Sequence, residues 1–145
     1  MSTDHIARAS IRINASPEEV WKALTTPKII KQYFFDTNAV SDWKAGSKLE
    51  WKGSWEGTEY IDKGVILESD PPRRFKYTYL SSMSGKEDKP ENYSQVTYEL
   101  EPKNGGTELI VSQTGNAIQE AAEHSQQNWI SVFNGMKEIL EKQSA

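Results

Sequence analysis

The stretch GVILESDPPRRFKYTY, residues 64–79, predicts two β-strands that meet at a rigid corner. The Asp-Pro-Pro sequence at residues 70–72 ends the first strand, because proline fixes φ and cannot donate a backbone hydrogen bond. After the corner, Phe75, Tyr77 and Tyr79 share one face of the second strand. That face is either a wall of the core or the wall of a pocket lined by two hydroxyls.

The same alternation of polar and apolar residues extends outward from this stretch. It recurs in these segments: 48–55, 58–68, 93–102 and 107–114. Asn104-Gly105 is typical of a hairpin turn, since both residues tolerate positive φ. We place a bulge at Gly64, where it would reset the register of its strand. Residues 36–114 therefore predict a sheet of about six antiparallel strands.

Helical patterns flank this sheet. Residues 16–19, Ser-Pro-Glu-Glu, form a capping box, and Pro27 opens a second short helix. A first strand at residues 5–14 precedes both helices. Residues 117–142 carry an apolar stripe with steps of three and four, so they predict one long helix. Within it, we expect Gly135 to permit close packing against the sheet.

These elements predict one α+β domain over residues 1–145. A curved antiparallel sheet can wrap its concave face around the long C-terminal helix. Two short helices follow the first strand. Wherever sheet and helix separate, a cavity remains between them.

The composition excludes several classes of function. The net charge is −4 and no basic run exceeds two residues, which argues against a nucleic-acid partner. The absence of cysteine removes disulfides and thiolate metal sites. The N-terminal residues lack the apolar core of a signal peptide, and no apolar run approaches the ~20 residues of a membrane span. These features predict a cytoplasmic protein.

With these segments in place, the chain resembles the START-like superfamily, also called SRPBCC, which has the helix-grip fold. Within it, the chain is similar to single-domain bacterial proteins grouped with the activator of heat-shock protein 90 ATPase homologues. The matching segments are ASPEEVWKALT (15–25), KAGSKLEWKG (44–53), GVILESDPPRRFKYTY (64–79), VTYELEPKNGGTELIVSQTG (96–115) and NWISVFNGMKEILE (128–141).

The resemblance implies a hydrophobic cavity between the sheet and the long helix, without implying one activity. Members of the superfamily include carriers of apolar ligands, cyclases, dehydratases and chaperone-linked domains. The first predicted strand begins near residue 5. We therefore do not expect the separate N-terminal domain that the eukaryotic chaperone activator uses for much of its partner binding.

Aromatic residues with inward parity are the candidate ligand-binding residues. Together with one amide and one residue of the cavity mouth, the candidates are Phe34, Trp51, Trp55, Phe75, Tyr77, Tyr79, Tyr98, Gln113, Trp129 and Phe133. Aromatic stripes usually serve packing, so the alternative for each is a core position. The ligand interpretation depends on the three tyrosine hydroxyls, which would orient a polar group of an otherwise apolar molecule. We expect Tyr77 and Tyr79 to face Trp129 and Phe133.

Two segments would border such a cavity. In the superfamily, the region after the short helices borders the mouth, so Phe34 is a candidate gate, with anchoring of the helices as its alternative. The polar segment 81–92 is either a lid or a solvated connection between strands.

Signals for catalysis or metal binding are weak. Glu120 and His124 are spaced i, i+4 on the last helix, but no third ligand is evident, and we expect an exposed helix surface and no metal. The alternation does not decide whether four acidic side chains point inward or outward: Asp36, Asp42, Glu59 and Asp62. No nucleophile elbow, phosphate-binding loop or zinc-protease motif occurs, so neither an enzyme nor a cofactor is indicated.

Three functions follow, in decreasing order of support. The first is binding of a small apolar or aromatic molecule in the cavity. The second is a cyclase or dehydratase acting on such a molecule, which needs a carboxylate or histidine beside the tyrosines. The third is a chaperone-linked interaction module, which needs an exposed apolar patch outside the cavity. The sequence leaves the ligand and the oligomeric state open.

Overall fold

A computed structural model describes residues 5–33, 37–55, 57–80, 87–89, 92–116 and 119–143, with the backbone alone described for His5, Trp55, Asn116 and Gln143. The elements in chain order are β1 (His5–Ile13), α1 (Pro17–Thr25), α2 (Pro27–Tyr33), β2 (Asn38–Ser41), β3 (Lys48–Trp55), β4 (Thr58–Asp70), β5 (Arg74–Tyr79), β6 (Ser94–Lys103), β7 (Gly106–Asn116) and α3 (Gln119–Gln143). The predicted order of one strand, two short helices, six strands and one long helix is confirmed.

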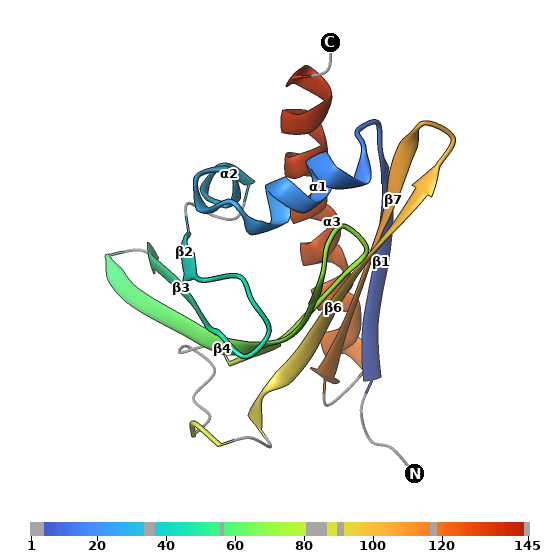
Figure 1. Ribbon diagram of the computed structural model, residues 1–145. Coiled ribbons are helices and arrows are strands. Elements are labelled where there is room, and N and C mark those ends of the chain that lie inside the picture. Colours follow the sequence, from blue (N-terminus) through green and yellow to red (C-terminus); the bar gives the residue numbers. More distant parts are fainter. Residues whose placement is uncertain are drawn as a thin grey trace.

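The strands form one antiparallel sheet in the order β1-β7-β6-β5-β4-β3-β2. The sheet is strongly curved, and α3 runs along the side formed by β1 and β7, while α1 and α2 lie across one end (Figure 1). The predicted α+β helix-grip fold is therefore confirmed. α3 contacts this side of the sheet closely, whereas the strands on the opposite side, β3 and β4, curve away from it.

Local sequence signals account for the turns and the first helix. Ser16 caps α1 by accepting a hydrogen bond from the Glu19 backbone N–H at 3.2 Å. In the hairpin between β6 and β7, Asn104 has φ 49° and Gly105 has φ 79°, the positive values of a type I′ turn. The corner after β4 closes through a 2.8 Å bond from the Arg73 N–H to the Asp70 carbonyl.

The expected position of the bulge in β4 is wrong. Inward-facing residues alternate without interruption from Tyr60 to Ile66, and the register shift relative to β5 lies between Ile66 and Glu68. Leu67 is the extra residue. Gly64 instead allows close approach of two backbones, since a Cβ there would lie 1.7 Å from the carbonyl oxygen of Thr78.

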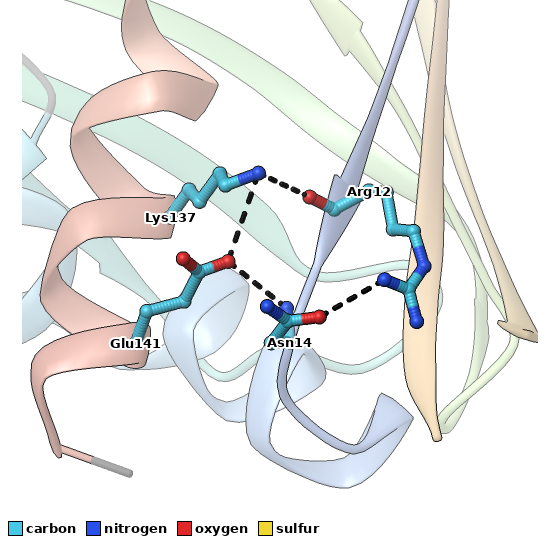
Figure 2. Close-up of polar contacts among 4 residues, drawn as sticks. All are labelled: Arg12, Asn14, Lys137 and Glu141. Carbon is cyan, nitrogen blue, oxygen red and sulfur yellow. Dashed lines mark hydrogen bonds and ion pairs between the residues drawn. The ribbon is translucent and has the colours of Figure 1, made fainter. Parts of the chain in front are cut away.

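Polar contacts fasten the C-terminal half of α3 to the end of β1 (Figure 2). Lys137 Nζ donates to the Arg12 carbonyl oxygen at 2.9 Å, and Glu141 accepts from the Asn14 backbone N–H at 3.1 Å. The Arg12 guanidinium in turn donates to Asn14 Oδ1 at 3.0 Å. This half of the helix is therefore fixed against the sheet, which leaves the other half to border the cavity.

The core lies between the concave face of the sheet and the three helices. Its largest fully buried side chains include Ile13, Leu49, Ile66, Phe75, Leu109, Phe133 and Met136. Gly135 lies over α2, with Tyr33 Cβ 3.4 Å from the position that a Cβ would occupy. The expectation that Gly135 packs against the sheet is therefore wrong.

Candidate functional site

A cavity of about 590 Å³ lies between the concave face of the sheet and the N-terminal half of α3. Its wall is mostly apolar and aromatic. The described lining residues are Thr37, Trp51, Tyr60, Asp62, Tyr77, Tyr79, Val96, Gln113, His124, Ser125, Asn128, Trp129 and Val132. This volume falls within the ~300–1,000 Å³ of small-molecule sites.

Strand pairing brings an acid and an indole together on the cavity wall. Trp51 of β3 lies directly opposite Asp62 of β4, so the two side chains share the inner face of the sheet. Two residues further along, Gly53 lies opposite Tyr60. A Cβ at Gly53 would lie 2.5 Å from the Tyr60 hydroxyl, so this glycine makes room for the tyrosine to lie across β3.

Asp62 is a buried carboxylate, with only 8% of its surface exposed. The Tyr79 hydroxyl donates to Asp62 Oδ2 at 2.8 Å. A carboxylate oxygen accepts more than one hydrogen bond, so the bond from Tyr79 does not by itself prevent a ligand group from binding Asp62. Asp62 is thus a polar anchor within a largely apolar wall.

Two further polar pairs border the cavity. The Tyr60 hydroxyl and Thr37 Oγ1 are 2.8 Å apart, which joins β4 to the segment before β2. On the other side, Trp129 Nε1 donates to Gln113 Oε1 at 2.8 Å and ties α3 to β7. His124 and Asn128 are exposed and Ser125 is half-buried, so this part of α3 forms the rim of the cavity.

The hydroxyls of Tyr77, on the cavity wall, and Tyr98, behind it, form a buried pair with the two oxygens 2.7 Å apart. Burial raises the pKa of the Tyr77 hydroxyl, and burial also raises the pKa of Tyr98 well above its ordinary value. Tyr33 donates to the Ala23 carbonyl at 2.8 Å, and its burial likewise raises its pKa. These hydroxyls are therefore neutral donors that satisfy one another or the backbone.

A family model described as "Activator of Hsp90 ATPase homolog 1-like protein" matches residues 14–141. The chain belongs to this family. The resemblance seen in the sequence is thereby confirmed.

Solved structures agree with this assignment. A protein from Cytophaga hutchinsonii is 43% identical over 100% of both chains, with a TM-score of 0.87. A protein from Mesorhizobium loti is 22% identical over 95% of this chain and 98% of that one, with a TM-score of 0.78. The Aha1 dimer from Colwellia psychrerythraea is 19% identical over 94% and 96%, with a TM-score of 0.73. The last two show the fold alone. Among curated proteins, none matches significantly.

The structure divides the predicted ligand-binding residues of this family member into three groups. Five line the cavity: Trp51, Tyr77, Tyr79, Gln113 and Trp129. Phe75, Tyr98 and Phe133 lie in the core behind it. Phe34 and the side chain of Trp55 lie outside the described residues, as do Asp36 and most of the segment 81–92, so their predicted roles stay predictions.

The expectation that Tyr77 and Tyr79 face Trp129 and Phe133 stays a prediction, although both tyrosines line the same cavity as Trp129. Tyr98 packs against Trp129 and Phe133, with ring centroids 5.7 and 5.9 Å apart. Tyr77 and Tyr79 each pack on Trp51, with ring centroids 5.2 Å apart. Because α3 lies along β1 and β7, the Tyr98 ring of the next strand, β6, still reaches it, whereas β5 lies one strand further away.

Sequence reasoning left several cavity residues unassigned. Asp62 and Tyr60 continue the inward alternation that runs back from Ile66, a signal that the misplaced bulge concealed. His124 lies off the apolar stripe, as expected, yet it borders the cavity. Asp42 and Glu59 are exposed and are not among the lining residues.

Two other kinds of feature are absent from the described residues. No group of three or more His, Asp or Glu side chains among them could hold a metal ion. Within the same residues, no helix combines the length and the apolar character needed to cross a membrane.

Proposed function

We propose that the chain binds a small apolar or aromatic molecule in the cavity between the sheet and α3. The observation that carries this proposal is the cavity itself: about 590 Å³, with a mostly apolar wall that includes the rings of Trp51, Tyr77, Tyr79 and Trp129. Protein interiors are normally packed to the density of organic crystals. Water in a cavity of this size makes weaker contacts with aromatic surface than an apolar ligand would, so a ligand would gain buried area there.

The polar groups of the wall support the same proposal. Asp62 and Gln113 lie on opposite sides of the cavity, each held by an aromatic donor, Tyr79 and Trp129 respectively. Ligand sites combine an apolar wall with a few polar groups whose orientation is fixed in this way. Such groups would orient the ligand, while the aromatic rings supply the buried area.

A cavity-filling variant tests this function. Ser125→Phe places a ring into the cavity from the half-buried rim of α3. Gln127→Phe, on the exposed side of the same helix, is the matched control. In a thermal-shift screen of phenols, polyketides and lipids, we expect saturable stabilisation of the wild type and of Gln127→Phe, with loss in Ser125→Phe. Absence of any saturable stabilisation in the wild type would refute the proposal.

A second candidate function is a cyclase or dehydratase acting on the bound molecule. One observation favours it: a buried carboxylate, Asp62, and an imidazole, His124, both border a cavity that also contains tyrosine hydroxyls. General acid–base catalysis needs such groups within reach of the ligand. Turnover of a bound ligand by the wild type, abolished in Asp62→Asn with binding retained, would favour the enzyme over the carrier.

A chaperone-linked role is the third candidate. It is supported by the family description and by Ile61, Val65 and Leu67 of β4, which are 38–49% exposed on the described surface. The test is ATP turnover by a reconstituted Hsp90 with and without the protein. A cytoplasmic location belongs with the same proposal.

A further inference from the structure

We propose that the cavity selects ligands in which a protonated amine is joined to an apolar or aromatic body. This inference depends on the proposed function, because it names the chemical class of the ligand. The relevant observations are the charge of the described cavity wall, the position of the Asp62 carboxylate on it, and the rings around that carboxylate.

The charge of the wall favours a cation. Among the described lining residues, Asp62 is the one carboxylate, and neither lysine nor arginine occurs. Apart from the tyrosines, the other ionisable lining residue is His124, at the exposed rim. An anionic ligand would bring a like charge next to Asp62, whereas a cation would bring an opposite one. The wall thus discriminates against carboxylates such as fatty acids.

The position of Asp62 makes it the deep polar anchor. It is buried on β4, and Tyr79 orients Oδ2 through the 2.8 Å hydrogen bond. An ammonium group provides three donors, and a carboxylate has capacity for more than one acceptor contact. Hydrogen bonds to charged groups are shorter and stronger than neutral ones, so the buried carboxylate gives an amine an advantage over an alcohol of the same shape.

Aromatic rings gather around this carboxylate. Trp51 lies directly across the strand pair from Asp62, and Tyr79 is bonded to it. Tyr77 and Tyr79 each lie 5.2 Å from the Trp51 ring, in tilted and edge-on arrangements. Clusters of Trp and Tyr attract organic cations through the negative faces of their rings. The same cluster therefore accommodates both the ammonium group and the apolar body next to it.

The experiment compares three probes with one carbon framework: 4-phenylbutylamine, 4-phenylbutan-1-ol and 4-phenylbutanoate, which are cationic, neutral and anionic at pH 7. Isothermal titration at fixed salt gives the affinity of each. We expect the amine to bind at least about tenfold more tightly than the alcohol, and the carboxylate most weakly. In Asp62→Asn, the preference for the amine over the alcohol falls to about onefold, because the amide carries no charge.

Glu59→Gln is the matched control, since it removes an acid from the exposed side of the same strand and should leave the selectivity intact. If Asp62→Asn does not fold, the order of the three probe affinities for the wild type still tests the charge inference. Equal affinities, or tighter binding of the alcohol or carboxylate, overturn the charge inference and leave the proposed function standing. If the amine does not bind while a neutral ligand from the thermal-shift screen does, the charge inference is again overturned and the proposed function again stands. If no ligand binds, both the charge inference and the proposed function are overturned.

Discussion

The hydroxyl of Tyr79 donates a 2.8 Å hydrogen bond to Oδ2 of Asp62, and this bond lies on the wall of the cavity. It connects β5 to β4 beyond Ile66 and Tyr77, which form the last residue pair of the ladder between the two strands. The sheet therefore uses a side-chain contact, as well as its ladder, to hold a carboxylate at a fixed position. We expect both the stability of the cavity wall and the proposed ligand selectivity to depend on this contact.

Replacing Tyr79 by Phe should lower the free energy of unfolding by about 1.5–2 kcal/mol, because a buried carboxylate loses a donor. The control is Tyr93→Phe, which removes a similar bond to Asp88 at the exposed surface and should cost less than about 0.5 kcal/mol. Urea unfolding of the two variants gives the comparison. Equal losses would contradict the assignment of Asp62 as a buried anchor.

The Tyr77–Tyr98 pair should show strong coupling in a double-mutant cycle. Either single Tyr→Phe change leaves one buried hydroxyl without its 2.7 Å partner and should cost about 1–3 kcal/mol. The double Phe variant removes both hydroxyls and should cost no more than either single variant. Additive losses in denaturant unfolding would show that the two hydroxyls do not depend on each other.

Stability should fall steeply at alkaline pH. Burial raises the pKa values of Tyr33, Tyr77 and Tyr98 in the folded chain, whereas tyrosines of the unfolded chain titrate near ~10. The stabilisation is complete below the unfolded value and is lost as the pH rises above it, by up to about 1.4 kcal/mol per pH unit for each group.

Unfolding free energies between pH 9 and 11.5 measure this loss. The control is the double variant Tyr77→Phe/Tyr98→Phe, which should show a clearly shallower decline because two of the three groups are absent. A constant stability over this range would be inconsistent with the burial of these hydroxyls.

Two glycines should respond oppositely to alanine. Gly64→Ala puts a Cβ against the Thr78 carbonyl and should cost at least about 3 kcal/mol, since two backbones must separate. In Gly135→Ala, the nearest atom is Tyr33 Cβ at 3.4 Å, an ordinary contact, so the higher helix propensity of alanine should stabilise the chain by up to about 1 kcal/mol. Thermal and urea unfolding should rank the two variants in this order.

The sequence was a good guide wherever one short-range pattern decided the outcome. Alternation predicted the inward faces of β3, β6 and β7. The capping box predicted the start of α1, and Asn104-Gly105 predicted the hairpin between β6 and β7. The bulge in β4 was misplaced because a glycine signals either a bulge or a close approach of backbones. At Gly64 only the contact with Thr78 distinguishes the two.

Periodicity could identify inward side chains but could not tell core from cavity. Phe75, Tyr98 and Tyr77 all face inward, yet only Tyr77 lines the cavity. The distinction depends on where α3 lies over the curved sheet. That position is fixed by contacts distant in sequence, such as Lys137 with the carbonyl of Arg12. Single-sequence patterns carry no information about such contacts.

The most direct test of the central claim, that the cavity holds a ligand, is a two-dimensional nitrogen–proton NMR titration that follows the indole N–H signals. Trp51 and Trp129 line the cavity, whereas Trp21 packs on Phe75 away from it and Trp43 is not among its lining residues. With 4-phenylbutylamine or another saturating ligand, we predict progressive shifts of the Trp51 and Trp129 signals, with those of Trp21 and Trp43 unchanged. Shifts confined to Trp21 and Trp43, or no saturable shift of any indole, would contradict the account.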